Sequence, residues 1–217
     1  STQQGQPYKV FTPFWRNALT RLHLPEAHAA PAKLRRHSVR GDDLDALGLQ
    51  PALGWDSGFW EHWQPGEDGA QDALGTFIDG ALQGYRTERD LPDRVGTSLL
   101  SPHLHFGEIS PWQIVRALEA ERRASRDADI DAYIRELGWR EFAHHLLHHF
   151  PQTTTENLNP RFDGFTWAKP SPSDLEAWQR GRTGVPIVDA GLRQLWQTGY
   201  VHNRVRMIVA SYLCKHM

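Results

Sequence analysis

The sequence has very little cysteine, no long apolar run and almost no net charge. Its single cysteine excludes a disulfide framework and any cysteine-rich zinc module. The formal net charge of −2 excludes the global basic field that many nucleic-acid-binding proteins carry. No apolar stretch approaches the about 18 residues that a transmembrane helix needs, and no secretory signal core is visible. We therefore expect a soluble, cytoplasmic protein with no membrane partner.

Tryptophan and histidine, by contrast, are abundant. The 217 residues include 9 tryptophans and 12 histidines, within a globular balance of 39% apolar and 23% charged residues. A tryptophan side chain has a large ring to bury and an N–H that needs a partner. This many of them suggests aromatic binding platforms in addition to ordinary core packing.

The chain divides into an irregular first part and a helical second part. Residues 1–63 read as a connector, because repeated prolines allow only a short helix at about 13–22. Residues 64–217 carry helical periodicity and N-cap signals such as Ser110-Pro111. The predicted helices lie at 70–85, 110–124, 127–149, 173–180, 186–198 and 203–216. No stretch alternates with a period of two, so the predicted fold class is all-α.

A hydroxyl-rich segment follows Gly96. Thr97, Ser98 and Ser101 surround Leu99 and Leu100 in a loop that could present hydroxyl and backbone N–H groups to one anion, as phosphate-binding nests do. An ordinary turn has the same composition. Both interpretations stay open on these residues alone.

The long helix at 127–149 carries a second candidate site. Glu136, Trp139 and Arg140 are spaced i, i+3 and i+4, which predicts one shared face. A carboxylate, a flat ring and a guanidinium together could recognise a nucleic-acid base and its phosphate. The alternative is a helical ion pair beside a core tryptophan.

Four histidines near the end of that helix form two i, i+4 pairs, His144 with His148 and His145 with His149. No carboxylate lies between them and no cysteine accompanies them, unlike the common zinc motifs. A polar, partly packed helix face is therefore the favoured interpretation, and no metal site is predicted.

The last helix, 203–216, has a stretch, Val205–Cys214, that is apolar on nearly every side, so we expect it to be buried. Arg206 lies within it, and a buried guanidinium without a partner is costly. We expect Arg206 to face either an earlier carboxylate or an anionic ligand.

Four separated motifs together resemble one known family. They are Tyr85–Asp90 (YRTERD), Thr97–Leu104 (TSLLSPHL), Trp139–Phe142 (WREF) and Val201–Met207 (VHNRVRM). In this order and spacing they are similar to the flavin domain of the DNA photolyase/cryptochrome family. The similarity also includes Val10–Trp15 (VFTPFW) and 185–199, and it covers most of the chain.

The resemblance implies a light-driven repair enzyme with FAD as its cofactor and damaged DNA as its partner. The positions that it assigns to FAD are Tyr85, Thr97, Ser98, Leu99, Leu100, Ser101 and Arg206. Those that it assigns to DNA are Arg89, Glu136, Trp139, Arg140, Asn203 and Arg204. Glu136 would hydrogen-bond a flipped-out pyrimidine dimer, and Trp167 matches the outermost tryptophan of an electron-transfer chain to the flavin. Light-excited, reduced flavin would donate the electron that splits the dimer.

Two positions favour a subgroup. Glu136 and Asn203 resemble the bacterial class I photolyases that repair cyclobutane dimers. The alternatives are a cryptochrome-type blue-light receptor on the same fold and a cofactor-free helical nucleic-acid-binding fragment. Repair of a dimer-containing DNA under light would distinguish a photolyase from a blue-light receptor. A flavin absorbance spectrum would argue against the cofactor-free fragment.

Family members are longer than this chain. They begin with an antenna domain, whose chromophore this sequence cannot identify. After the position that corresponds to Met217 they continue with a further helical segment. We therefore expect a truncated flavin region that binds FAD weakly, repairs no DNA alone, and can dimerise through exposed core. No oligomeric state is predicted beyond that.

Overall fold

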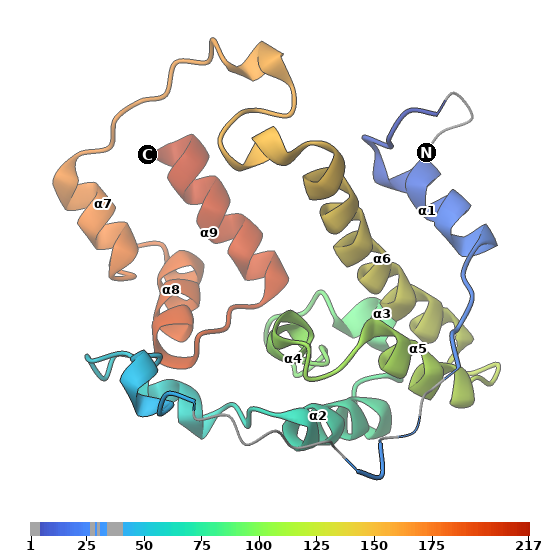
Figure 1. Ribbon diagram of the computed structural model, residues 1–217. Coiled ribbons are helices and arrows are strands. Elements are labelled where there is room, and N and C mark those ends of the chain that lie inside the picture. The colour runs from blue at the N-terminus through green and yellow to red at the C-terminus, as the bar shows by residue number, and fades with distance from the viewer. Residues whose placement is uncertain (1–4, 27–28, 30, 34–40) are drawn as a thin grey trace.

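The computed structural model describes residues 5–26, 29, 31–33 and 41–217; residues 1–4, 27–28, 30 and 34–40 of the predicted connector lie outside them. Within the described residues the secondary structure is helical, with no strand, which confirms the all-α prediction (Figure 1). The α-helices are α1 (Phe11–Thr20), α2 (Glu67–Asp79), α3 (Tyr85–Glu88), α4 (Ser101–Phe106), α5 (Pro111–Ala120), α6 (Asp127–His149), α7 (Pro172–Gln179), α8 (Pro186–Thr198) and α9 (Asn203–His216). Short 3₁₀ helices occur at Asp45–Leu47, Ser57–Glu61, Pro151–Thr154 and Pro160–Phe162.

Local signals place most helix starts correctly. The Ser110 hydroxyl accepts a hydrogen bond from the Gln113 N–H at 3.2 Å, and the Gln113 amide oxygen accepts from the Ser110 N–H at 2.8 Å. This capping box satisfies two otherwise unpaired donors at the start of α5, whose first residue is Pro111. The predicted bounds of α6, α8 and α9 are confirmed.

The predicted helix at 70–85 is wrong after residue 79. Helix α2 ends at Asp79, and Gly84 adopts a φ of +92° that interrupts the helical path. The Asp129 carboxylate of α6 accepts hydrogen bonds from the N–H groups of Gly84 (3.0 Å) and Arg86 (2.8 Å). These tertiary bonds start a separate short helix, α3, at Tyr85.

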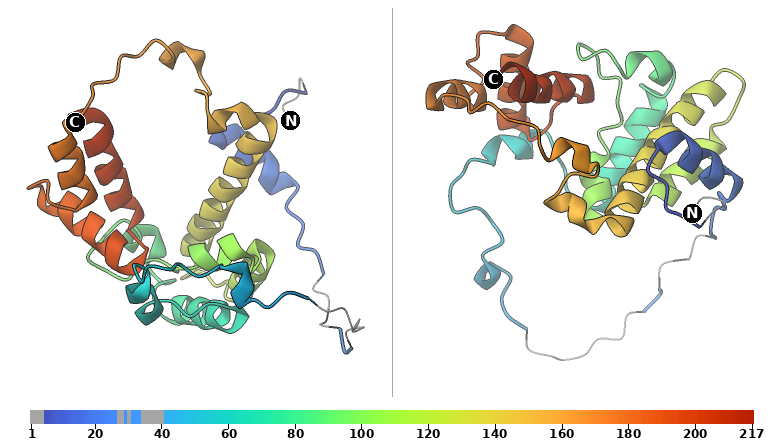
Figure 2. Two further views of the ribbon diagram at one scale, coloured as in Figure 1. Left: turned by 60° about the vertical axis from the view of Figure 1, so that its left-hand side comes forward. Right: turned by 90° about the horizontal axis from the view of Figure 1, so that it is seen from above.

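Two apolar cores hold the helices together. The larger one lies among α2, α3, α5 and α6, and its least exposed side chains include Leu82, Ile114, Leu118 and Ile130. The smaller one joins α8 to α9 through valines and one leucine, with Trp178 of α7 packed against it. Figures 1 and 2 show α7, α8 and α9 standing apart from α6, and the 3₁₀ helix Ser57–Glu61 lies against α8.

Helix α1 packs on α6, although it belongs to the predicted connector. Phe11 is 4% exposed, and Trp15 lies directly over Gly138 of α6. A Cβ at position 138 would come within 2.5 Å of the Trp15 ring, so only glycine permits this close approach. At the other end of the connector, the Trp63 indole N–H donates to the Thr198 carbonyl of α8 at 2.6 Å. Residues before 64 therefore contribute to the helical core.

The predicted burial of α9 is wrong. Only Val205 and Val209 of this helix are buried, whereas Met207 is 57% exposed and Ile208 is 39% exposed. Within the described residues α9 packs on α8 through Val205 and Val209, and Trp178 of α7 packs against the same small core. Arg206 is accordingly exposed and needs no buried counter-ion.

The histidine-rich end of α6 anchors the chain that leads into α1. The His145 Nε2 accepts a hydrogen bond from the Tyr8 N–H at 3.1 Å, and its ring lies 5.1 Å from that of Phe14. No group of three or more metal-ligating side chains is found among the residues that the structure describes. Burial, together with the neighbouring His149, lowers the pKa of His145 below its ordinary value near 6.5.

Acidification is therefore expected to loosen α1. A lowered folded-state pKa means that the unfolded chain binds the proton more readily, so this contribution to stability is present above about pH 6.5 and is lost as the pH falls below it. A protonated Nε2 cannot accept from the Tyr8 N–H, and a hydrogen bond contributes about 0.5–1.5 kcal/mol.

Denaturant unfolding at pH 7.5 and 5.5 checks this expectation. The variant His145→Gln keeps an acceptor at both pH values, and it should lose less stability on acidification than the wild type. The exposed His144 offers the matched control, and His144→Gln should follow the wild type. Equal losses in both variants would contradict the role given to His145.

Candidate functional site

A groove of about 540 Å³ runs between α3 and α6, with α1 at one side. We call it the α3–α6 groove. Its lining residues are Trp15, Arg86, Arg89, Asp90, Ala128, Asp131, Ala132, Arg135, Glu136 and Trp139. Three of the residues assigned to DNA by sequence, namely Arg89, Glu136 and Trp139, thus meet in one place. The groove carries three arginines on a chain whose net charge is negative.

Arg140 does not join this site, which corrects the predicted shared face. Successive α-helical residues are rotated by about 100°, so Trp139 and Arg140 point in different directions from the helix axis. The Arg140 guanidinium donates to the Leu104 carbonyl at 3.3 Å and pairs with Glu141 at 3.3 Å. It therefore lies on the α4 side of α6.

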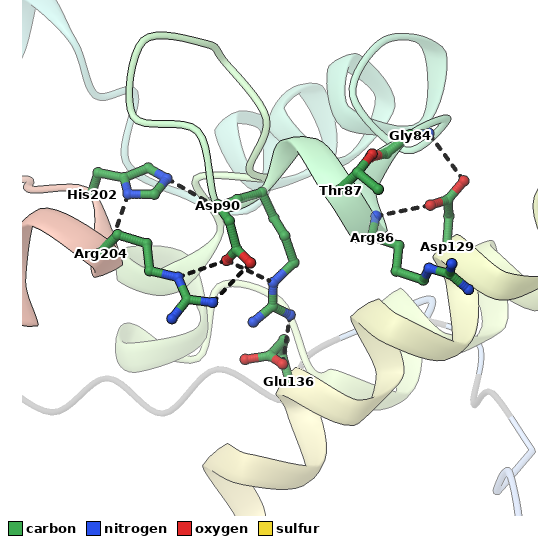
Figure 3. A network of polar contacts seen from close by, with 9 residues as sticks. Gly84, Arg86, Thr87, Asp90, Asp129, Glu136, His202 and Arg204 are labelled. Atoms are coloured by element: carbon green, nitrogen blue, oxygen red, sulfur yellow. Dashed lines mark hydrogen bonds and ion pairs between the residues drawn. The ribbon is translucent and has the colours of Figure 1, made fainter.

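An alternating chain of charges starts at the groove residues Glu136, Arg89 and Asp90 and continues to Arg204. The Arg89 Nη1 lies 2.5 Å from Glu136 Oε1, and its Nε lies 3.6 Å from Asp90 Oδ1. Asp90 in turn receives two hydrogen bonds from Arg204, at 2.9 Å from Nε and 2.8 Å from Nη2 (Figure 3). Glu136 of α6, the end of α3 and the start of α9 are thereby connected. The Arg204 hydrogen bonds hold the pKa of the Asp90 carboxyl below its ordinary value.

His202 fixes the position of Arg204. Its Nδ1 accepts from the Arg204 N–H at 3.2 Å and caps α9. Because Nδ1 is an acceptor, Nε2 carries the proton, and it donates to the Arg89 carbonyl at 3.0 Å. This buried imidazole ties the first turn of α9 to the end of α3 (Figure 3). Sequence reasoning did not single out His202 or Asp90, although both lie inside the motifs that it quoted.

Trp139 is the flat surface of the groove. Its ring is stacked on Phe11 with centroids 3.6 Å apart and planes 10° apart, and Phe11 lies nearly parallel to Trp15 at 6.0 Å. Phe11 therefore covers one face of the indole from behind. Trp139 nevertheless stays 44% exposed, so part of its surface is available to a ligand. The helical periodicity of α6 could not predict that Phe11, on a different helix, stacks on Trp139.

Asn203, the remaining predicted DNA residue, is exposed at the first position of α9, next to Arg204. It does not line the groove, but in sequence it directly precedes Arg204, which pairs with the groove residue Asp90.

A second hollow, of about 350 Å³, lies between α4 and the start of α9. We call it the α4–α9 cavity. It is lined by Phe59, Trp60, Trp63, Pro65, Ser101, Pro102, His103, Phe106, Glu108, Gly199, Tyr200 and Arg206. Two of the residues assigned to FAD, Ser101 and Arg206, are among them. Within the described chain Arg206 has no carboxylate at ion-pair distance, and its hydrogen bond to the Val201 carbonyl is long, at 3.5 Å. A guanidinium without a carboxylate partner, beside aromatic walls and a hydroxyl, fits an anionic, planar cofactor.

The rest of the predicted FAD loop is engaged with protein. The Thr97 hydroxyl lies 3.2 Å from the Tyr200 hydroxyl, and the Ser98 hydroxyl lies 2.7 Å from that of Tyr133. Leu99 has a φ of +55°, an uncommon backbone conformation for a residue with a side chain. Burial raises the pKa of Tyr133 to about 12, so this phenol stays protonated. Thr97 reaches the α4–α9 cavity only through Tyr200.

Tyr85 and Leu100, also assigned to FAD, are core residues here. Leu100 is 1% exposed and Tyr85 is 6% exposed. The Tyr85 ring packs 5.5 Å from Phe77 and 5.1 Å from Tyr133, and burial raises the pKa of its hydroxyl. Neither residue lines the α4–α9 cavity.

Trp167 lies on the long segment between α6 and α7. It is 65% exposed, and its ring contacts Phe165 at 4.8 Å. It lines neither the groove nor the cavity.

No described helix is both long and apolar enough to cross a bilayer.

Comparisons with known proteins agree with the motifs. Residues 133–217 match the family described as the FAD binding domain of DNA photolyase. The deoxyribodipyrimidine photo-lyase of Agrobacterium fabrum is 50% identical, and the match covers 100% of this chain and 46% of that protein. Cryptochrome-1 of Arabidopsis thaliana is 31% identical over 97% of this chain and 32% of its own length.

A solved structure has the same fold. It is a bacterial class III photolyase from Agrobacterium tumefaciens, with a TM-score of 0.91 and 49% identity, covering 100% of this chain and 45% of that one. Glu136 and Asn203 favour class I in the sequence analysis, whereas this neighbour is described as a class III photolyase. The chain spans about half the length of the curated photo-lyases that it matches. Residues 133–217 thus belong to the FAD-binding domain family of DNA photolyases, and over its whole length the chain is a relative of photolyases and cryptochromes.

Proposed function

We propose that this chain forms the flavin- and DNA-contacting half of a light-driven enzyme that splits cyclobutane pyrimidine dimers in DNA. The observation that carries the proposal is the convergence of Glu136, Trp139 and Arg89 on the α3–α6 groove. A carboxylate beside an exposed ring suits a pyrimidine dimer, two linked bases of one strand, that has left the helix. The 49% identity to a class III photolyase favours that class over the class I subgroup.

The groove residues would recognise the lesion as follows. The exposed surface of Trp139 stacks against the extruded dimer, and Phe11 holds the indole in place from behind. Glu136 accepts a hydrogen bond from a pyrimidine N–H, while Arg89 keeps its carboxylate oriented. Extrusion costs least where stacking is already damaged, which favours dimers over intact bases.

The residues at the rim would hold the DNA backbone. Arg204 and Asn203 are both exposed at the start of α9, and a guanidinium pairs well with phosphate oxygens. Such contacts fix the position of the duplex and leave the choice of site to the groove.

FAD would lie against the α4–α9 cavity, with Ser101 and Arg206 as its polar contacts. When bound and reduced, this cofactor supplies under light the electron that opens the cyclobutane ring and then takes it back. Arg206 balances negative charge on the cofactor, and the aromatic walls exclude water. Trp167, exposed on its loop, is proposed as the outer end of an electron path to the cofactor.

A blue-light receptor is the second candidate function. The 31% identity to Cryptochrome-1 of Arabidopsis thaliana over 97% of this chain favours it specifically. A receptor would bind FAD and respond to light without repairing dimers.

Replacing the matching segment of the Agrobacterium fabrum photo-lyase by this chain tests repair. We expect the hybrid to remove dimers from an oligonucleotide under blue light, and the chain alone to remove none. Glu136→Gln should slow repair by the hybrid about ten-fold, because a hydrogen bond to a charged group contributes about 1.5 kcal/mol or more.

Glu141→Gln is the matched control, since Glu141 is exposed on α6 outside the groove. A folded hybrid with bound flavin but no light-dependent repair would contradict the enzyme and favour the receptor. A folded hybrid without flavin absorbance would contradict both.

A further inference from the structure

The Asp90 carboxylate occupies the side of Arg204 that recognises phosphate. Both the Nε and Nη2 of Arg204 donate to it, at 2.9 and 2.8 Å, in a two-pronged arrangement (Figure 3). A phosphate diester offers two oxygens to a guanidinium in the same way. In this structure, therefore, DNA and Asp90 would need the same two donors.

The Asp90–Arg204 ion pair is exposed enough for a phosphate to replace Asp90 as the partner of Arg204. The side chains of Asp90 and Arg204 are 41% and 48% exposed, and exposed ion pairs are weak. After losing Arg204, the Asp90 carboxylate would still have a cationic partner, because Arg89 Nε lies 3.6 Å from its Oδ1. Arg89 itself is held by Glu136 at 2.5 Å and stays at the groove.

We propose that Asp90 competes with a DNA phosphate for the guanidinium of Arg204, and that this competition lowers the affinity of the chain for all DNA. The inference rests on the proposed function, and it adds a residue that opposes binding to those that support it. Phosphate contacts carry no sequence information. The competition therefore weakens binding to damaged and undamaged DNA by the same factor.

Asp90→Asn is expected to strengthen binding to both DNAs about five-fold, which corresponds to about 1 kcal/mol for a bidentate exposed pair. The ratio between the two affinities should stay unchanged. In an Arg204→Ala background the same substitution should change affinity by less than about two-fold, because the contested guanidinium is gone.

The experiment uses this chain and two labelled duplexes, identical except for one thymine dimer. Affinities are measured by fluorescence anisotropy at low and at physiological salt. Asp93→Asn is the matched control, since it removes the same charge from an exposed residue three positions away. Far-UV circular dichroism checks that each variant is folded.

The outcomes separate the inference from the function on which it rests. A weaker Asp90→Asn variant would show that Asp90 positions Arg204, and equal gains in Asp90→Asn and Asp93→Asn would show a general charge effect. Either result overturns the inference while a preference for dimer DNA still supports the function. No binding by any variant would overturn both.

Discussion

Phe11→Ala is expected to lower the free energy of unfolding by about 3–5 kcal/mol, the range measured for removing a buried phenylalanine ring. Phe11 is 4% exposed and packs between Trp15 and Trp139, with Phe142 at 5.8 Å. Its removal leaves a cavity between α1 and α6, where the ring now packs. Denaturant unfolding of the purified chain measures the loss.

Two variants make this result interpretable. Leu19→Ala, on the same helix at a position 47% exposed, should change stability by no more than about 0.5 kcal/mol. Phe11→Tyr retains the stacked ring, and it should recover most of the lost stability. A loss below 1 kcal/mol in Phe11→Ala would mean that α1 is not held on α6 through this ring.

Trp139→Leu is expected to weaken binding to dimer-containing DNA by about 5- to 150-fold, the effect of losing about 1–3 kcal/mol of stacking on an aromatic ring. Leucine still covers Phe11 but offers no flat surface to a base. Affinity for undamaged duplex should hardly change, because its bases stay stacked and do not reach the groove. Anisotropy titrations with both duplexes measure the two effects.

Trp196 provides the control for this prediction. It is 58% exposed on α8, outside the α3–α6 groove. Trp196→Leu should leave both affinities unchanged, and Trp139→Phe should keep most of the preference for the dimer. Equal losses on both duplexes in Trp139→Leu would argue for a structural tryptophan rather than a lesion platform.

Local sequence signals predicted most of the longer helices and two groove residues on α6. The periodicity and caps gave α6, α8 and α9 with their bounds, and the i, i+3 spacing put Glu136 and Trp139 together. The same reasoning failed at Arg140, because the Leu104 carbonyl binds it on the other side of the helix. It failed again at residue 84, where the Asp129 carboxylate starts a new helix.

Contacts between distant residues had no signal in a single sequence. Asp90 and Arg204 are 114 positions apart, and nothing in either segment indicates that they form an ion pair. Phe11 lies in a proline-rich region that reads as a connector, yet it supports Trp139. The apolar pattern of α9 predicted burial, but hydrophobicity alone does not say which faces have a neighbouring helix.

The preference of the wild-type chain for damaged DNA tests the central claim most directly. The measurement compares its affinity for a duplex with one thymine dimer and for the same duplex without it. A groove built from Trp139, Glu136 and Arg89 for an extruded lesion predicts a preference of at least about ten-fold. Equal affinities for the two duplexes would contradict the assignment of the α3–α6 groove to lesion recognition.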